Sequence, residues 1–323
     1  MNSPIRLGFA VKVLGRAGLK EHDSRRWQNN PHLSVSLAYL RDIFEYLRGQ
    51  RISMYRVSSD LAPYATHPDM PQFHNQLDEC AAELEMMGDL ARAIGLRLSF
   101  HPSQYVILNS TDEALTAKSV WDLQIQAELL DRMALGPEAV VVIHVGGVYE
   151  GREPARERFA RRYEQLPDAV QRRLVLENDD VRFGVADIAW IHQHTGVRLV
   201  FDNLHHRNYN PDQIPLRDAL ALCLVTWPAD VRPKIHFSSP RTEMRLIERQ
   251  DKETGRRVTE LQQPLWTRHS DFIHPFEFID FLRGAAGLRP FDVMLECKAK
   301  DLALLRLRED LTRYAPDLGE RVT

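Results

Sequence analysis

Short apolar runs recur along the chain, and each ends in a polar side chain. The run 174–176 is followed by Glu177, and an unbroken run of this length is typical of a parallel strand buried on both faces. Five further runs end in the same way, at His101, His144, Asp202, His236 and Glu296. Because a buried charge is unfavourable unless it is paired or bound to a metal, six such ends predict a shared centre with Glu177 in its middle.

Amphipathic segments separate these runs. In residues 34–47 the apolar positions follow the helical period of 3.6 residues. Two more strands are expected over 6–10 and 52–57, and further helices over 73–94, 112–135, 152–165, 185–194, 212–226, 276–286 and 301–314. Eight strands alternating with helices predict a (β/α)₈ TIM barrel with its site at the carboxyl ends of the strands. The alternative is a doubly wound open sheet, but no GxGxxG sequence follows the first strand.

Three connections are long: 11–33, 60–72 and 240–273. We expect them around the site face of a single domain spanning 1–323. The first contains basic residues and Trp27, which suit either contact with nucleic acid or a solvated loop. The third is polar and rich in arginine. A segment of that length predicts an irregular functional lid or a disordered excursion.

Composition limits the alternatives. The chain has 323 residues, 44% hydrophobic and 27% charged, without an evident linker, as in ordinary globular proteins. Its formal charge of −3 means that any contact with nucleic acid must depend on local patches. Three scattered cysteines without a CxxC spacing suit a reducing compartment and do not suggest a thiolate metal site. No apolar run is long enough to span a membrane, so we expect a cytoplasmic protein without a membrane partner.

The candidate ligands are imidazoles and carboxylates. They are His101, His144, Glu177, Asp202, His205, His236, His269 and Glu296. Eight ligands exceed the need of one catalytic zinc, so we expect two or three divalent metals; Mn²⁺ or Zn²⁺ suits these donors, and Mg²⁺ is a further possibility. Our assignment gives one metal His101, His144 and Glu177, a second Glu177, Asp202, His236 and Glu296, and a third His205 and His269, with Asp202 shared.

Lys234 and His67 are candidate site residues that do not lie at the carboxyl end of a strand. Lys234 precedes His236 by two residues and therefore faces the same way along a strand, so we group it with Glu177 and His236 as candidate catalytic residues. It forms either an ion pair or, as the less favoured alternative, a carbamylated metal ligand. His67 lies in a long connection and not at a strand end. A structural role is expected for it, with a place in the site as the alternative.

Seven ordered motifs resemble those of the ultraviolet damage endonucleases. They are His101-Pro-Ser-Gln104-Tyr105, His144-Val-Gly-Gly, Glu177-Asn-Asp, Asp202-Asn-Leu-His205-His206, Lys234-Ile-His236-Phe-Ser-Ser, His269-Ser-Asp271 and Glu296-Cys-Lys298. The resemblance implies a multi-metal barrel, usually active with manganese, that nicks damaged double-stranded DNA immediately 5′ to a pyrimidine photoproduct. The mechanism we expect is metal-assisted hydrolysis, in which hydroxide attacks the phosphorus in line and the 3′ oxygen leaves, so the products are a 3′-hydroxyl and a 5′-phosphate. The resemblance also implies that Gln104 and Tyr105 enter the duplex at the lesion.

The chain departs from the family after its first strand. A tyrosine-proline-cysteine run is common there, whereas this sequence has Phe9-Ala10-Val11. Phe9 is therefore a candidate lesion contact without the phenolic hydroxyl, and an altered lesion range is expected.

Three other functions use similar features. An abasic-site endonuclease of the endonuclease IV type has a similar barrel and metal set, although here a histidine precedes the aspartate in the third-metal motif. A sugar isomerase of the xylose isomerase type would not need the basic segment 241–268. A DNA-damage binding module without enzymatic activity would have no use for eight converging ligands. No obligate protein partner is expected.

Overall fold

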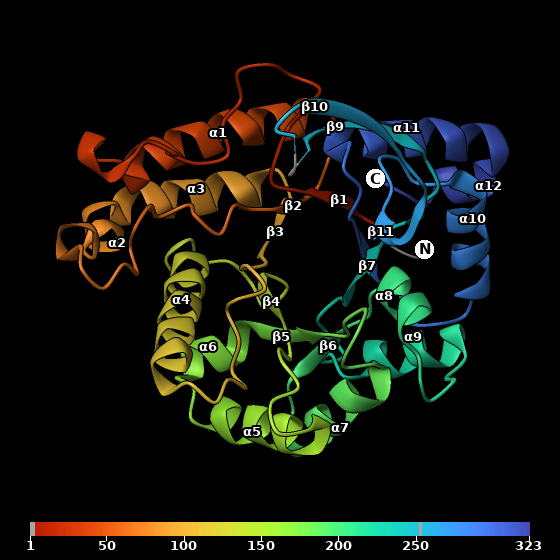
Figure 1. Ribbon diagram of the computed structural model, residues 1–323. Helices are drawn as coiled ribbons and strands as arrows, with labels where there is room; N and C mark the ends of the chain where they lie inside the picture. The colour runs from red at the N-terminus through yellow and green to blue at the C-terminus, as the bar shows by residue number, and fades with distance from the viewer. Residues whose placement is uncertain (1–3, 252–253) are drawn as a thin grey trace.

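The computed structural model describes residues 4–251 and 254–323 and is built around one parallel sheet (Figure 1). The sheet has eight strands in the order β6-β5-β4-β3-β2-β1-β12-β7. Their bounds are β1 Leu7–Ala10, β2 Met54–Arg56, β3 Arg97–Phe100, β4 Val140–His144, β5 Leu174–Glu177, β6 Arg198–Val200, β7 Lys234–Phe237 and β12 Asp292–Leu295. All eight correspond to the strands expected from the sequence.

The two ends of this sheet meet. A parallel bridge pairs Asp202, just after β6, with His236 of β7, and the His236 amide donates a 2.9 Å hydrogen bond to the carbonyl of Phe201. The sheet is therefore a nearly closed barrel. The TIM-barrel prediction is confirmed, and the open-sheet alternative is wrong.

Helices surround the barrel. They are α1 Leu33–Gly49, α2 Gln76–Glu79, α3 Ala81–Ala93, α4 Glu113–Arg132, α5 Arg152–Glu164, α6 Asp168–Arg173, α7 Val185–Thr195, α8 Asn203–Asn208, α9 Leu216–Val225, α10 Pro275–Gly284, α11 Lys300–Tyr314 and α12 Pro316–Gly319, with 3₁₀ turns η1 Trp27–Asn29 and η2 Pro71–Phe73. The helix expected over 73–94 is two helices, because the chain turns at Cys80. Within the described residues, no helix is both long and apolar enough to cross a membrane.

Alternate strand residues face the helices or the barrel interior. Leu174 and Leu176 belong to the main core with the helices, whereas Val175 belongs to a separate small cluster with Val200 and Trp227. Much of the remaining interior is polar. Near the amino ends of the strands, Arg97 donates a 2.8 Å hydrogen bond to Asp292, and both side chains are buried.

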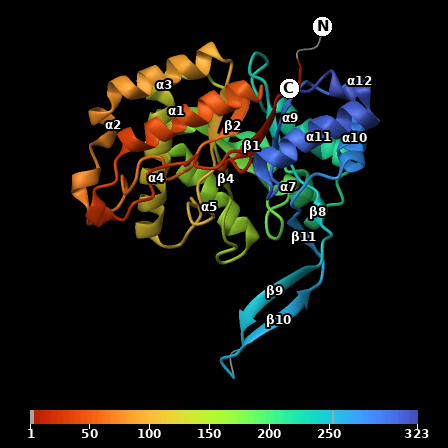
Figure 2. The ribbon, with the colours of Figure 1, turned by 90° about the horizontal axis from the view of Figure 1, so that it is seen from above.

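The segment 240–273 is not irregular, which corrects the prediction. It forms two antiparallel pairs, β8 Pro240–Arg241 with β11 Leu265–His269 and β9 Arg245–Gln250 with β10 Arg257–Gln262. The β9–β10 pair, hereafter the distal ribbon, stands out from the barrel (Figure 2). Its side chains are largely solvent-exposed on both faces, so its sequence lacks the alternation of a half-buried strand.

Helix α4 depends on its N-cap. Asp112 Oδ1 accepts hydrogen bonds from the amides of Ala114 (2.8 Å) and Leu115 (3.2 Å). We expect Asp112→Ala to lower the free energy of unfolding by about 1 kcal/mol, as typical for a lost cap, while Asp112→Asn keeps the acceptor oxygen and most of the stability. Urea unfolding of both variants measures this. Equal stability of the two variants would contradict the capping role.

Candidate metal centre

The strand alternation brings the candidate ligands to the barrel mouth. Glu177 follows the inward position Val175 by two residues, and His144 follows Val142 in the same way. The same spacing relates His101 to Ser99 and His236 to Lys234. The side chains of Ser99 and Lys234 meet across the interior, where Lys234 Nζ lies 2.9 Å from Ser99 Oγ. The ligands therefore form the layer nearest the carboxyl ends, where barrels of this fold hold their active sites.

Glu177 lies at the centre of this layer and is fully buried. Its Oε1 is 2.8 Å from His236 Nδ1 and 3.4 Å from His205 Nδ1. Its Oε2 is 3.0 Å from His101 Nε2 and 3.7 Å from His144 Nε2. The two carboxylate oxygens thus face different pairs of imidazoles, which is the arrangement a bridging carboxylate needs.

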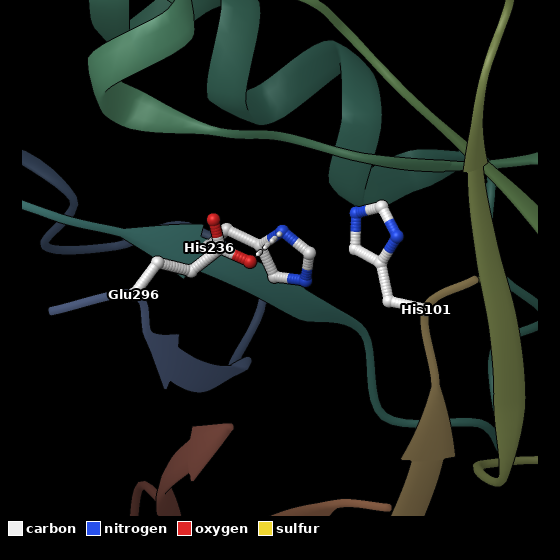
Figure 3. Close-up of side chains that lie close together, drawn as sticks. All are labelled: His101, His236 and Glu296. Carbon is white, nitrogen blue, oxygen red and sulfur yellow. Dashed lines mark ion pairs between the residues drawn. The ribbon is translucent and has the colours of Figure 1, made fainter. Parts of the chain in front are cut away.

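Among the described residues, three groups of side chains have ligand atoms within 4.8 Å of one another. Two of them, His101–His144–Glu177 and Glu177–Asp202–His236–Glu296, are the sets assigned from the sequence to the first two metals. The third group joins His101, His236 and Glu296 (Figure 3), a combination that the sequence did not suggest.

His205 and His269 lie at the edge of the cluster and outside these three groups of described residues. His205 Nδ1 is 3.8 Å from an oxygen of Asp202, and His269 Nε2 is 3.9 Å from an oxygen of Glu296. Their ring centroids are 5.9 Å apart. Both side chains reach the mouth, and their assignment to a third metal stays a prediction.

The electrostatics of the cluster suit cations. Burial raises the pKa of Asp202 to about 7, and its Oδ2 is buried without a hydrogen-bond partner among the described residues. Burial also lowers the pKa of His236 to about 4, which keeps the imidazole in the neutral form that binds metals. Burial opposes ionisation of Glu177, but His236 and His144 hold its pKa well below the ordinary value. These donors fit divalent metals.

Hydrogen bonds with an amide side chain and a hydroxyl group hold two of the ligands. The Asp202 amide donates a 2.8 Å hydrogen bond to Asn178 Oδ1, and the Asn178 side chain donates to the Asp202 carbonyl at 3.2 Å. His269 Nδ1 lies 2.7 Å from Ser238 Oγ. Such outer contacts orient ligands and tune their basicity.

Arg56 is a site residue that the sequence reading missed. Its Nη2 is 3.0 Å from His236 Nε2 and also contacts Glu296 Oε1. Arg56 ends β2, so it occupies the same strand-end position as the ligands. That strand-end position is the signal in the sequence, although a guanidinium group is not a metal ligand.

The residues expected to contact DNA lie in different environments. Tyr105 is 72% exposed in the connection between β3 and α4, and Gln104 beside it is also exposed. Both line a cavity of about 590 Å³ together with His144, His205 and His269. The exposed pair therefore borders the space above the ligand cluster.

Phe9 and His67 are the other two candidate site residues, and neither belongs to a metal group among the described residues. Phe9 is fully buried and packs edge-on against Tyr55. It belongs to the main core shared with the helices, whereas a direct lesion contact needs an exposed ring, so this position does not favour the contact, which stays a prediction. His67 lies away from the metal groups, in a separate cavity of about 760 Å³ that also contains His22 and Ser58.

Known proteins similar to this chain in sequence come from one family. The model of the family UV-endonuclease UvdE matches residues 22–318. A UV DNA damage endonuclease of Bacillus velezensis is 32% identical over 295 residues, covering 90% of this chain and 85% of that protein. The corresponding protein of Bacillus mycoides is 34% identical over 268 residues, covering 82% and 77%.

A solved structure extends the likeness to the fold. The crystal structure of SacUVDE has a TM-score of 0.79 at 32% identity, covering 96% of this chain and 98% of that one. A D-tagatose 3-epimerase-like protein, at 12% identity and a TM-score of 0.55 over 98% of this chain and 99% of that one, shares the barrel fold alone. The chain therefore belongs to the UV-endonuclease UvdE family.

Proposed function

We propose that this member of the UvdE family, a UV DNA damage endonuclease and hence a hydrolase acting on DNA, cuts the phosphodiester immediately 5′ to a pyrimidine photoproduct. The products would be a 3′-hydroxyl and a 5′-phosphate. The proposed substrate is damaged double-stranded DNA, which the enzyme would meet inside the cell. The observation that carries the proposal is the buried carboxylate of Glu177 with four imidazoles around it.

The ligand cluster supports a multi-metal reaction. His101, His144 and Glu177 would hold one ion, and Glu177, Asp202, His236 and Glu296 a second. His205 and His269 are proposed for a third, and Mn²⁺ is the proposed metal. Bound divalent ions would supply Lewis-acid activation of water and stabilise charge on the phosphate.

The protein's own groups would position the substrate. Gln104 and Tyr105, exposed beside the cavity, would occupy the space left when the damaged bases are displaced. Arg56 provides a buried positive charge beside His236 and Glu296. Lys234, buried beneath the cluster against Ser99, is proposed as a positioning residue, and intact mass of the native protein would reveal a carbamyl group on it.

Two other enzymatic functions remain as alternatives. An abasic-site endonuclease would use the same cluster on a different lesion. A metal-dependent sugar isomerase would use a small pocket, whereas this mouth lies beside a protruding ribbon that a sugar would not need (Figure 2). The likeness to sugar epimerases is a likeness of fold.

One experiment separates these functions. Purified protein is incubated with end-labelled duplexes that contain one cyclobutane dimer, one abasic site or no damage, in Mn²⁺, in Zn²⁺ or in chelator. We expect a cut 5′ to the dimer in Mn²⁺ and none in chelator, with activity restored when Mn²⁺ is returned. Cutting at the abasic site alone, or no cutting in any metal, would overturn the proposal.

A further inference from the structure

None of the described residues of the distal ribbon belongs to the buried core of the barrel. It is a two-stranded pair of six residues in each strand, and an isolated pair of this kind is marginally stable in water. Leu246 and Leu261 are directly opposite each other in the pair and are 75% and 49% exposed. These side chains have no barrel core beneath them, so the ribbon leaves its surface open to a partner.

The root of the ribbon is continuous with the metal centre. The ribbon follows β8, which starts three residues after β7, and returns through β11, which ends at His269. His269 Nδ1 lies 2.7 Å from Ser238 Oγ, just beyond β7. Ion pairing between Arg245 and Asp271 at 2.5 Å fixes the base of β9. The base of the ribbon therefore adjoins the metal centre.

The ribbon and the Gln104–Tyr105 connection stand on opposite sides of the mouth. Three strands separate β3 from β7 in either direction around the barrel. The cavity between them is lined by Tyr105 from one side and by Arg268 and His269 from the other. A duplex that meets Tyr105 at its lesion would thus extend toward β11 and the ribbon.

The charge of the ribbon region fits such a partner. Among the described residues between Pro240 and His269 there are six arginines and four carboxylates, although the whole chain carries a formal charge of −3. Arg256 and Arg257 are exposed at the start of β10. Arginine is suited to phosphate contacts, and a two-stranded ribbon fits the major groove of DNA.

We propose that the distal ribbon binds the duplex that flanks the lesion. The inference rests on the proposed function, and it assigns the ribbon a part in substrate affinity and none in the chemical step. At about 3.3 Å per residue, six residues span roughly 20 Å, which corresponds to about six base pairs at 3.4 Å each. The ribbon therefore extends the contact with DNA by about that length on one side of the cut.

The test shortens the ribbon and the DNA independently. Deleting residues 246–261 and joining Arg245 to Gln262 through an Asn-Gly turn keeps the cross-strand pair at the base and supplies a suitable hairpin turn. A second variant, Arg256→Gln with Arg257→Gln, keeps the ribbon. The matched control is Arg41→Gln with Arg48→Gln, two exposed arginines on α1.

Two readouts are compared with the intact protein. The first is kcat/KM for nicking of dimer-containing duplexes trimmed stepwise from either end. For the intact protein, we expect kcat/KM to fall about tenfold when one arm of the duplex is trimmed by about six base pairs. For the deletion variant, we expect kcat/KM on the full-length duplex to have that lower value already and to show no further loss on trimming. The second is fluorescence anisotropy with undamaged duplex in chelator, where the double arginine variant should reduce the slope of log affinity against log salt by about one to two.

The outcomes distinguish this proposal from the proposed function. Nicking with the same length profile and the same salt slope in all variants would overturn the ribbon proposal alone. An intact protein that binds DNA through the ribbon but never nicks it would overturn the proposed function alone. Conversion of a dimer to a monomer by the deletion, in analytical ultracentrifugation, would show that the ribbon binds a second copy instead.

Discussion

Replacing Glu177 by glutamine is expected to lower nicking by at least about 1,000-fold while lesion binding is retained. The glutamine has the same shape but is neutral, and only one of its two terminal atoms is an acceptor. Glu177 shares its oxygens among His101, His144, His205 and His236, so the substitution removes the ligand common to two metal groups. Loss of several kcal/mol of metal-based stabilisation corresponds to this decrease.

Three measurements check this prediction: single-turnover nicking, affinity for the dimer-containing duplex and metal content by mass spectrometry. The matched control is Asp180→Asn, which neutralises a carboxylate lining the same cavity outside the metal groups. We expect the control to keep activity within a few-fold. Nicking by Glu177→Gln within tenfold of the intact protein, at unchanged metal content, would show that Glu177 is not the bridge.

The strands and most of the ligand cluster were predictable because both follow from local pattern. A parallel strand buried on both faces must be an apolar run, so each strand was visible in the sequence. Parallel strands end together at one side of a barrel, and side chains two residues apart share a face. Those two facts are enough to predict one layer that contains His101, His144, Glu177, His236 and Glu296.

The features that sequence reading missed depend on contacts far apart in the chain or on solvent exposure. In the sequence, Arg56 is an ordinary strand residue. Its place in the site depends on its contacts with His236 and Glu296, which are distant in the chain. Both faces of the distal ribbon are exposed, so its two strands lack the alternation of apolar and polar residues that would reveal a strand in the sequence. Phe9 is different: Leu7 and Phe9 alternate with Gly8 and Ala10, a local pattern that indicates one apolar face, whereas the expected lesion contact came from the family resemblance alone.

Removing the two exposed side chains beside the cavity is expected to weaken discrimination of damage and leave the metals in place. In Gln104→Ala with Tyr105→Ala, the ratio of kcat/KM for dimer-containing over undamaged duplex should fall about 10- to 100-fold, since stacking of one base on an aromatic ring contributes about 1–3 kcal/mol. Val181→Ala, which trims another exposed side chain of the same cavity, is the control and should keep the ratio.

The direction of this effect follows from where the two side chains lie. Tyr105 is 72% exposed and belongs to none of the metal groups, so its loss leaves the ligands and their burial intact. A damaged step is less costly to unstack than an undamaged one, and a ring that fills the resulting gap stabilises only the opened duplex. Metal content should therefore be unchanged while the preference for damage declines. An unchanged preference in the double variant would place lesion recognition elsewhere, with the cavity of about 760 Å³ that contains His22 and His67 as the next region to test.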